Sequence, residues 1–122
     1  MSSNNNKYDL EERTAKFGED IIDLCQKIEK DFINRPILNQ LLRSGTSIGA
    51  NYMEANGASS KKDFRNKIFI CKKEAQETKH WLRMTKKAIS IENQKVEYLA
   101  NEGQELIFIF QKITSSLDSK KV

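Results

Sequence analysis

Four segments of the chain repeat apolar or small residues at spacings that alternate between three and four, and this rhythm constrains the fold most. The members, segment by segment, are Leu10, Thr14, Phe17, Ile21, Leu24 and Ile28; Leu38, Leu41, Gly45, Ile48, Tyr52 and Ala55; Phe64, Ile68, Cys71, Ala75, Thr78, Leu82, Thr85 and Ile89; Val96, Leu99, Gly103, Leu106, Phe110, Ile113 and Leu117. This spacing places the side chains on one stripe of an α-helix, and helices with such stripes pack at shallow angles. No segment sustains the alternation of a strand. The sequence therefore predicts an all-α four-helix bundle.

Turn and capping signals separate the four segments. Asn34-Arg35-Pro36 reads as a cap followed by the only proline, which the first turn of a helix tolerates. Gly57 ends the second segment, Ser60-Lys61-Lys62-Asp63 resembles a capping box, and a polar break precedes the fourth segment. Because the connections are short, consecutive helices are expected to be antiparallel, in an up-down-up-down order. The predicted organisation is one domain over residues 1–122, with helices at about 9–32, 36–57, 61–89 and 93–117 and frayed tails at 1–7 and 118–122.

Composition excludes several classes of protein. No apolar run approaches the roughly 18 residues of a membrane span, and the polar stretch from Met1 to Lys7 does not read as a signal peptide. A cytoplasmic location is therefore expected. Cys25 and Cys71 lie in apolar surroundings and are expected to be reduced core residues, since their spacing matches no zinc site.

Four basic residues, here called the basic ladder, follow one another at intervals of seven in the third segment: Arg65, Lys72, Lys79 and Lys86. Seven residues correspond to about two helical turns and ~10.5 Å of rise, so these charges line one flank of a helix. Residues 61–88 hold ten Lys or Arg against three Asp or Glu, a net charge of +7, whereas the rest of the chain carries −3. The positive charge of the protein is therefore concentrated on one helix.

Two interpretations of the basic ladder remain open. In the first, it belongs to a basic strip that follows the phosphates of RNA or DNA. That strip consists of Lys62, Arg65, Lys72, Lys73, Lys79, Arg83, Lys86 and Lys87. No aromatic residue is expected to interleave the ladder as base stacking would require, so the predicted contact is with the backbone and is not sequence-specific. In the second, the ladder pairs with carboxylates of a neighbouring helix. The first segment offers Glu11, Glu12, Glu19, Asp20 and Asp23.

Apolar residues outside the core stripe suggest a subunit interface. On the other flank of the third segment, Ile70, Glu77 and Met84 follow one another at intervals of seven, and Trp81 lies beside them. Exposed apolar patches of this kind are typical of interaction sites. The run from Leu106 to Phe110 is apolar on every side, so no single core face is expected to bury it. The candidate interface residues are Ile70, Trp81, Met84, Ile107, Phe108 and Ile109.

The second segment is unusually rich in small and polar residues between Arg43 and Asn51. Gly45 and Gly49, four residues apart, permit close approach of a neighbouring helix, and Arg43, Asn51 and Glu54 suggest a polar network on one side. The stretch lacks the Gly-Lys-Ser/Thr ending of a phosphate-binding loop.

The sequence predicts no active site, metal or cofactor. The one histidine, His80, ends a Glu-x-x-His motif that begins at Glu77, but di-iron bundles need two such motifs and further glutamates. Nucleophilic catalysis also needs partners that a single histidine does not supply here.

Two long motifs resemble one bacterial family. The chain reads LLRSGTSIGANYMEA from Leu41 to Ala55 and KKEAQETKHWL from Lys72 to Leu82. These runs, with Asn34-Arg35-Pro36 and the stretch from Asp63 to Lys67, resemble the four-helix-bundle family that includes proteins encoded in intervening sequences of 23S ribosomal RNA genes. The resemblance covers about residues 8–115. The chain is also similar to the accessory protein of diversity-generating retroelements, which works with a reverse transcriptase and RNA through a basic surface.

The resemblance implies an up-down-up-down bundle that assembles into a ring, as a homopentamer, and an association with ribosomal RNA by genetic location. It implies no catalytic residues. The resulting prediction is a non-enzymatic, ring-forming protein that binds RNA or DNA and no membrane; the alternative is an oligomeric protein-interaction adaptor that does not bind nucleic acid.

Overall fold

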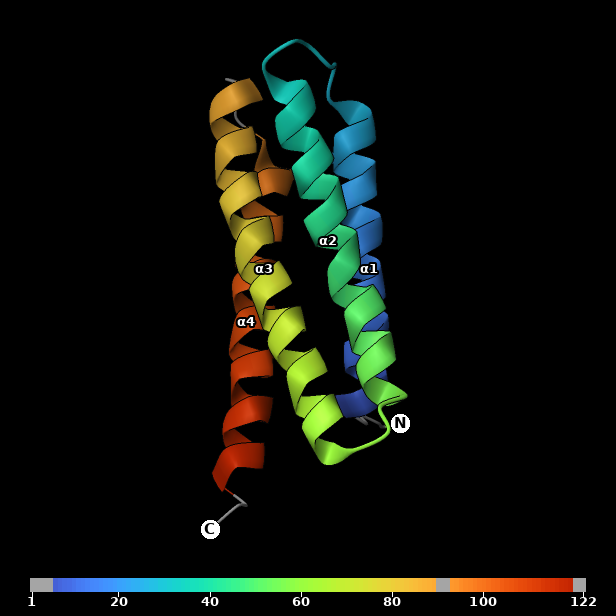
Figure 1. Cartoon of the computed structure of the whole chain (residues 1–122). Helices are drawn as coiled ribbons and strands as arrows, with labels where there is room; N and C mark the ends of the chain where they lie inside the picture. Colours follow the sequence, from blue (N-terminus) through green and yellow to red (C-terminus); the bar gives the residue numbers. More distant parts are fainter. Residues whose placement is uncertain (1–5, 90–92, 120–122) are drawn as a thin grey trace.

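The computed structural model describes residues 6–89 and 93–119, with side chains from Leu10 onward. These residues form four helices: α1 (Asn6–Lys27), α2 (Asn34–Asn56), α3 (Lys61–Ile89) and α4 (Gln94–Ser119). The helices lie side by side, and the chain runs up and down between them so that both termini emerge at the same end (Figure 1). The predicted all-α four-helix bundle is confirmed.

Contacts between helices show that neighbours in sequence run antiparallel. At one end of the bundle Asn56 of α2 donates a hydrogen bond to Glu11 of α1, and at the other end Cys25 of α1 meets the carbonyl of Leu38. Around the bundle, α3 packs against α2 and α4, and α1 packs against α2 and, less extensively, against α4. α1 therefore lies diagonally across from α3.

The predicted stripes form the core. Their central members are buried in all four helices, while members near helix ends, such as Ile28, Phe64 and Ile113, are partly buried against them. Cys25 and Cys71 are free and buried, as expected. Burial disfavours the charged thiolate and raises the pKa of both thiols, that of Cys71 to about 12.

α1 and α2 approach each other closely where α2 carries glycine. A Cβ atom at Gly45 would lie 2.8 Å from Cγ1 of Ile21, and one at Gly49 would lie 3.4 Å from the backbone of Thr14. A distance below 3.0 Å leaves no room for a methyl group unless Ile21 moves. The close helix approach predicted from the two glycines is confirmed, and α1 is the partner.

The turn between α1 and α2 starts earlier than predicted. The Oδ1 atom of Asp31 accepts hydrogen bonds from the backbone N–H groups of Ile33 (2.9 Å) and Asn34 (2.8 Å). In return, the Oδ1 atom of Asn34 accepts from the N–H of Asp31 at 3.0 Å. This reciprocal arrangement is that of a capping box centred on Asp31. α1 consequently ends at Lys27 rather than near residue 32, and Asn34, the predicted cap, is a buried residue inside the first turn.

The other helix ends follow the predicted signals more closely. The N–H of Asp63 donates to Oγ of Ser60 at 3.0 Å, which confirms the cap of α3. Asn93 caps α4 through the N–H of Lys95 at 2.8 Å. The predicted tails are shorter than expected, because residues 6–7 and 118–119 are helical; residues 1–5 and 120–122 lie outside the described residues. Within the described ranges no helix is both long and apolar enough to cross a membrane.

Candidate nucleic-acid interface

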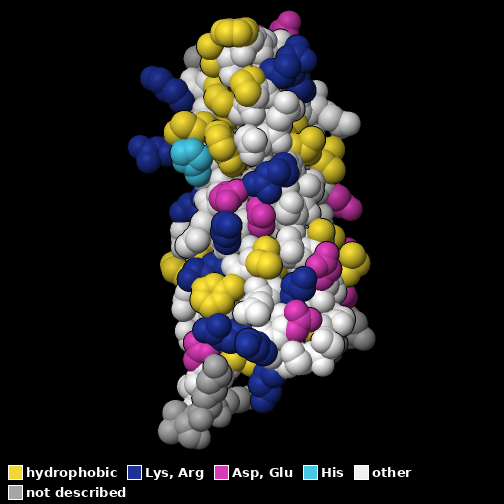
Figure 2. All heavy atoms as spheres, in the orientation of Figure 1, with side chains coloured by type: hydrophobic (Ala, Val, Ile, Leu, Met, Phe, Trp, Pro, Cys, Tyr) yellow, Lys and Arg dark blue, Asp and Glu magenta, His cyan; other side chains and the backbone are white. Residues whose placement is uncertain are grey.

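The charged residues of α3 are divided between its two flanks. All three of its acidic residues, Asp63, Glu74 and Glu77, have their hydrogen-bond partners in α2 or in the turn that precedes α3. The basic ladder lies on the opposite flank, beside α4. In Figure 2, Lys and Arg side chains gather on the left of the view, over α3 and its border with α4, and Asp and Glu lie mostly over the middle and right. The flank of α3 beside α4 therefore carries mainly basic residues.

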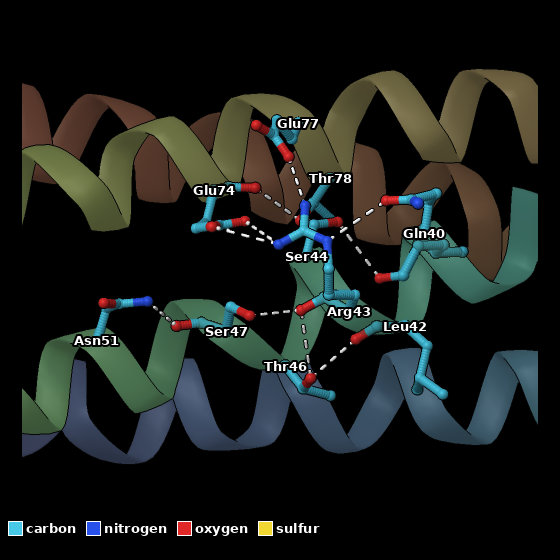
Figure 3. Close-up of polar contacts among 11 residues, drawn as sticks. Gln40, Leu42, Arg43, Ser44, Thr46, Ser47, Asn51, Glu74, Glu77 and Thr78 are labelled. Carbon is cyan, nitrogen blue, oxygen red and sulfur yellow. Dashed lines mark hydrogen bonds and ion pairs between the residues drawn. The ribbon is translucent and has the colours of Figure 1, made fainter.

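On the acidic flank, Arg43 of α2 joins α2 to α3 (Figure 3). Its guanidinium donates to Glu74 at 3.2 Å and to Glu77 at 2.5 Å. Beneath it, Oγ1 of Thr78 donates to Oγ of Ser44 at 3.0 Å, and both hydroxyls are buried. Each hydroxyl also lies within hydrogen-bond distance of a backbone carbonyl of its own helix, Glu74 for Thr78 and Leu41 for Ser44, so both buried groups have partners.

The predicted polar network on α2 is only partly observed. Glu54 forms an ion pair with Lys67 of α3 at 3.0 Å, but Asn51 donates to the backbone carbonyl of Ser47 on its own helix. Thr46 and Ser47 also donate to backbone carbonyls of α2 (Figure 3). Thr46, Ser47 and Asn51 thus bond to their own helix, and the stretch from Arg43 to Asn51 is helical and forms no phosphate-binding loop.

Each residue of the basic ladder meets one residue of α4. Arg65 donates two hydrogen bonds to Asp118, at 2.6 and 2.9 Å, and Lys86 lies 2.5 Å from Glu97. Between these ion pairs, Lys72 donates to the side-chain carbonyl of Gln111 and Lys79 to that of Gln104. The partners in α4 are themselves seven residues apart: Glu97, Gln104, Gln111 and Asp118. The ladder is one half of an antiparallel pairing between α3 and α4.

The second interpretation is correct in part: Arg65 and Lys86 pair with carboxylates of a neighbouring helix, but that helix is α4, and the suggestion of α1 is wrong. α1 lies diagonally across the bundle, and two of its carboxylates have other partners: Asp20 binds Lys16 and Lys95, and Glu11 accepts from Asn56. The heptad of polar residues in α4 was the sequence signal for the true partner.

The pairing with α4 leaves the basic strip positive. Among the described residues, Arg65 and Lys86 are the two ladder residues paired with carboxylates, while the neutral glutamines do not compensate the charge of Lys72 or Lys79. The hydrogen bonds that Arg65 donates to Asp118 raise the pKa of its guanidinium. The other four members of the strip are exposed and form no ion pair with another described residue: Lys62, Lys73, Arg83 and Lys87. Within the described part of the chain, the eight cations of the strip are paired with two carboxylates, an excess of six positive charges.

An aromatic residue does lie within the strip, contrary to expectation. Phe69 is 42% exposed. Cζ of Arg65 lies 4.9 Å from the centroid of its ring, and Nζ of Lys72 lies 5.7 Å from it. The sequence contained the signal, since residue 69 comes four after one ladder residue and three before the next, which puts it on the same helical face.

The candidate interface residues are divided between surface and core. Ile70 is 38% exposed and Phe108 is 65% exposed. Trp81, Ile107 and Ile109 are partly buried and pack against the core of their own chain, and Met84 is also partly buried. Within the run 106–110, Leu106 and Phe110 are buried, Ile107 and Ile109 are partly buried, and Phe108 is exposed, as expected of a run that no single core face can bury.

Ile109 also lines a groove between the ends of the helices where the chain termini emerge. The groove has a volume of about 810 Å³, and its apolar wall includes Leu10, Tyr52, Ile113 and Leu117. At its edge Arg13 is held by Glu102 at 2.7 Å and Glu105 at 2.8 Å, which raises the pKa of the guanidinium. These ion pairs join α1 to α4 beside the groove.

The neighbourhood of His80 does not resemble a metal site. The side chain is exposed, and its ring centroid lies 4.8 Å from that of Trp81 in an edge-on contact. Glu77, the glutamate of the Glu-x-x-His motif, forms an ion pair with Arg43. Over the described part of the chain, no three His, Cys, Asp or Glu side chains are grouped so that they could hold a metal ion.

Comparison with known proteins agrees with the fold and the motifs. A family model described as 23S rRNA-intervening sequence protein matches residues 6–112. The crystal structure of a protein of unknown function from the S23 ribosomal protein family of Bacteroides thetaiotaomicron is similar, with 34% sequence identity and a TM-score of 0.77 over 86% of this chain and 97% of the other. No curated protein matches, and the likeness to the retroelement accessory protein stays a prediction. The chain belongs to the family of 23S rRNA-intervening sequence proteins.

Proposed function

We propose that the protein binds the backbone of RNA or DNA through the basic strip, without catalysing a reaction. The observation that carries this proposal is that neutral amides hold Lys72 and Lys79, so the strip has an excess of six positive charges over the carboxylates that pair with it among the described residues. Phosphates attract such a surface, and their bound counterions are released when lysine or arginine replaces them.

The glutamines of α4 also order the lysine side chains before a nucleic acid binds. An ammonium group has three N–H donors, so one bond to Gln111 or Gln104 leaves donors for a phosphate oxygen. Side chains that are already ordered lose less conformational entropy on binding. The heptad spacing repeats this arrangement about every 10.5 Å along α3.

Replacing both Lys72 and Lys79 by glutamine is expected to weaken binding of RNA and duplex DNA and to reduce its dependence on salt. Glutamine can still hydrogen-bond to α4 but carries no charge. Loss of two phosphate contacts should lower the slope of log affinity against log salt for duplex DNA by about 1.8. Fluorescence anisotropy titrations at several salt concentrations measure this slope.

A control with the same loss of charge is Lys27→Gln with Arg35→Gln, because both side chains are exposed and lie outside the strip. Equal effects of the two double variants would show that only net charge matters. Absence of wild-type binding at low salt would contradict the proposal and favour the adaptor hypothesis.

We also propose that the chain forms a homo-oligomer, and from the resemblance a pentameric ring in the cytoplasm. The exposed side chains of Ile70 and Phe108 support a subunit contact, and the two free thiols support a reducing compartment. Several strips around one axis would add multivalent contacts to one nucleic acid.

Light scattering is expected to report a multiple of the 14.1 kDa chain mass, and a smaller mass after Ile70→Lys with Phe108→Lys. Exposed lysine in place of a buried apolar contact disfavours association. The control Met53→Lys changes an exposed apolar residue that is not an interface candidate. A wild-type mass of 14.1 kDa at micromolar concentration would refute the oligomer.

A further inference from the structure

Phe69 is a partly exposed aromatic residue that lies among the cations of the basic strip. Residues of α3 at alternating spacings of three and four form a continuous stripe on the side that faces α4: Lys62, Arg65, Phe69, Lys72, Gln76, Lys79, Arg83 and Lys86. The stripe contains no acidic residue and extends over about 36 Å of helix. Phe69 is its only aromatic member. In the lower part of Figure 2, hydrophobic surface lies among Lys and Arg side chains.

The cations around the ring are held in place. Arg65 lies 4.9 Å from the ring centroid while Asp118 accepts two hydrogen bonds from it, so its guanidinium is fixed against one part of the ring. Lys72 lies 5.7 Å from the centroid while Gln111 accepts from its ammonium group. With both cations in place the residue is still 42% exposed, and positive charge borders its ring. Proteins that bind single strands combine an aromatic ring and backbone-binding cations in this way.

We infer that Phe69 stacks on an unpaired base of single-stranded RNA while Arg65 and Lys72 contact the phosphates on either side. This inference rests on the proposed function and adds to it a preference for unpaired strands. In a duplex both faces of each base are stacked on neighbouring base pairs, so a ring on a helix surface cannot reach them. We choose RNA because the family to which the chain belongs is named for ribosomal RNA.

Phe69→Leu is the substitution that tests the inference. Leucine keeps an apolar side chain of similar reach but removes the π-face. The affinity for an unstructured single-stranded RNA, such as a 20-nucleotide oligouridine, is expected to fall about tenfold, within the range found when a stacked aromatic is removed. The affinity for duplex RNA of the same length should stay the same, and Phe69→Tyr should restore single-strand binding. The measurement is fluorescence anisotropy, with mass by light scattering on each variant.

The matched control is Tyr98→Leu. Tyr98 is also an exposed aromatic with a lysine over its ring, at 4.9 Å from Lys95, but it lies outside the stripe. This variant should bind single-stranded RNA like the wild type. Equal affinity of Phe69→Leu and wild type, or an equal loss for both RNA forms, would overturn the inference while salt-dependent binding kept the proposed function. A change of mass in Phe69→Leu would assign the ring to a subunit contact instead.

A direct observation of stacking is also available, since the chain has one tryptophan, Trp81. Phe69→Trp in a Trp81→Phe background places the only tryptophan in the stripe. Its fluorescence is expected to be quenched by single-stranded RNA and unaffected by duplex RNA. Unchanged fluorescence at saturating single-stranded RNA would overturn the inference, even where anisotropy shows binding.

Discussion

Replacing Phe110 by alanine is expected to lower the free energy of unfolding by about 3–5 kcal/mol, the cost of large-to-small changes in a packed core. Phe110 is 0% exposed, and its ring centroid lies 6.4 Å from that of Tyr52 on α2. Its removal takes away the burial of a whole phenyl group and leaves a cavity that the rigid helices can fill only in part. Small domains are stable by only about 5–15 kcal/mol, so the loss would be a large share of the total.

Urea unfolding followed by circular dichroism, at one fixed protein concentration, measures this change. The control is Phe32→Ala, the same substitution at a residue that is 89% exposed in the turn between α1 and α2. Its effect should stay within about 0.5 kcal/mol. Similar unfolding midpoints for the two variants would contradict the position of Phe110 in the core.

Replacing Gly45 by leucine is expected to destabilise the protein by about 3 kcal/mol through overpacking between α1 and α2. The new Cβ alone would lie 2.8 Å from Cγ1 of Ile21, and Ile21 is fully buried, so it has no free space to move into. Leucine adds three further carbon atoms at the same place. Its better helix propensity, about 1 kcal/mol relative to glycine, offsets only part of the cost.

Ala50→Leu is the matched control, since it adds a branched side chain to an exposed position of the same helix. This variant should unfold at nearly the wild-type urea concentration. The intermediate variant Gly45→Ala should lie between the two. A stability of Gly45→Leu equal to that of Ala50→Leu would show that α1 can move away from α2 at little cost.

For the basic ladder, the pattern within one helix predicts the flank on which the residues lie but not the helix that they meet. The spacing of Arg65 and Lys86 correctly placed them on one flank of α3, because side-chain direction repeats along a helix. α1, the helix suggested as a possible partner, is not the one that meets the ladder. In an up-down-up-down bundle the third helix neighbours the second and fourth, so the predicted topology already excluded the first. Which of these two neighbours meets the ladder depends on the hand of the bundle, and a heptad pattern does not encode that hand.

Of the helix caps, that of α3 could be predicted from the sequence and that of α2 could not. Ser60 was predicted as the cap of α3 because its hydroxyl and Asp63 have the spacing of a capping box. The cap of α2 was missed because Asp31 lies within what reads as the continuing pattern of α1. Its capping role became visible only with the reciprocal bonds to Asn34.

The sequence by itself determined the core and the charge of this protein. The 3–4 rhythm selects which side chains point inward on each helix, and this selection is local, so it survives any arrangement of the four helices. The tertiary structure decided which charges are compensated. Amides of α4 meet Lys72 and Lys79 while carboxylates meet Arg65 and Lys86, because compensation depends on the distance between groups far apart in the chain. The exposure of Phe69 likewise depends on how α3 and α4 pack, since Phe69 lies between two residues that bond to α4.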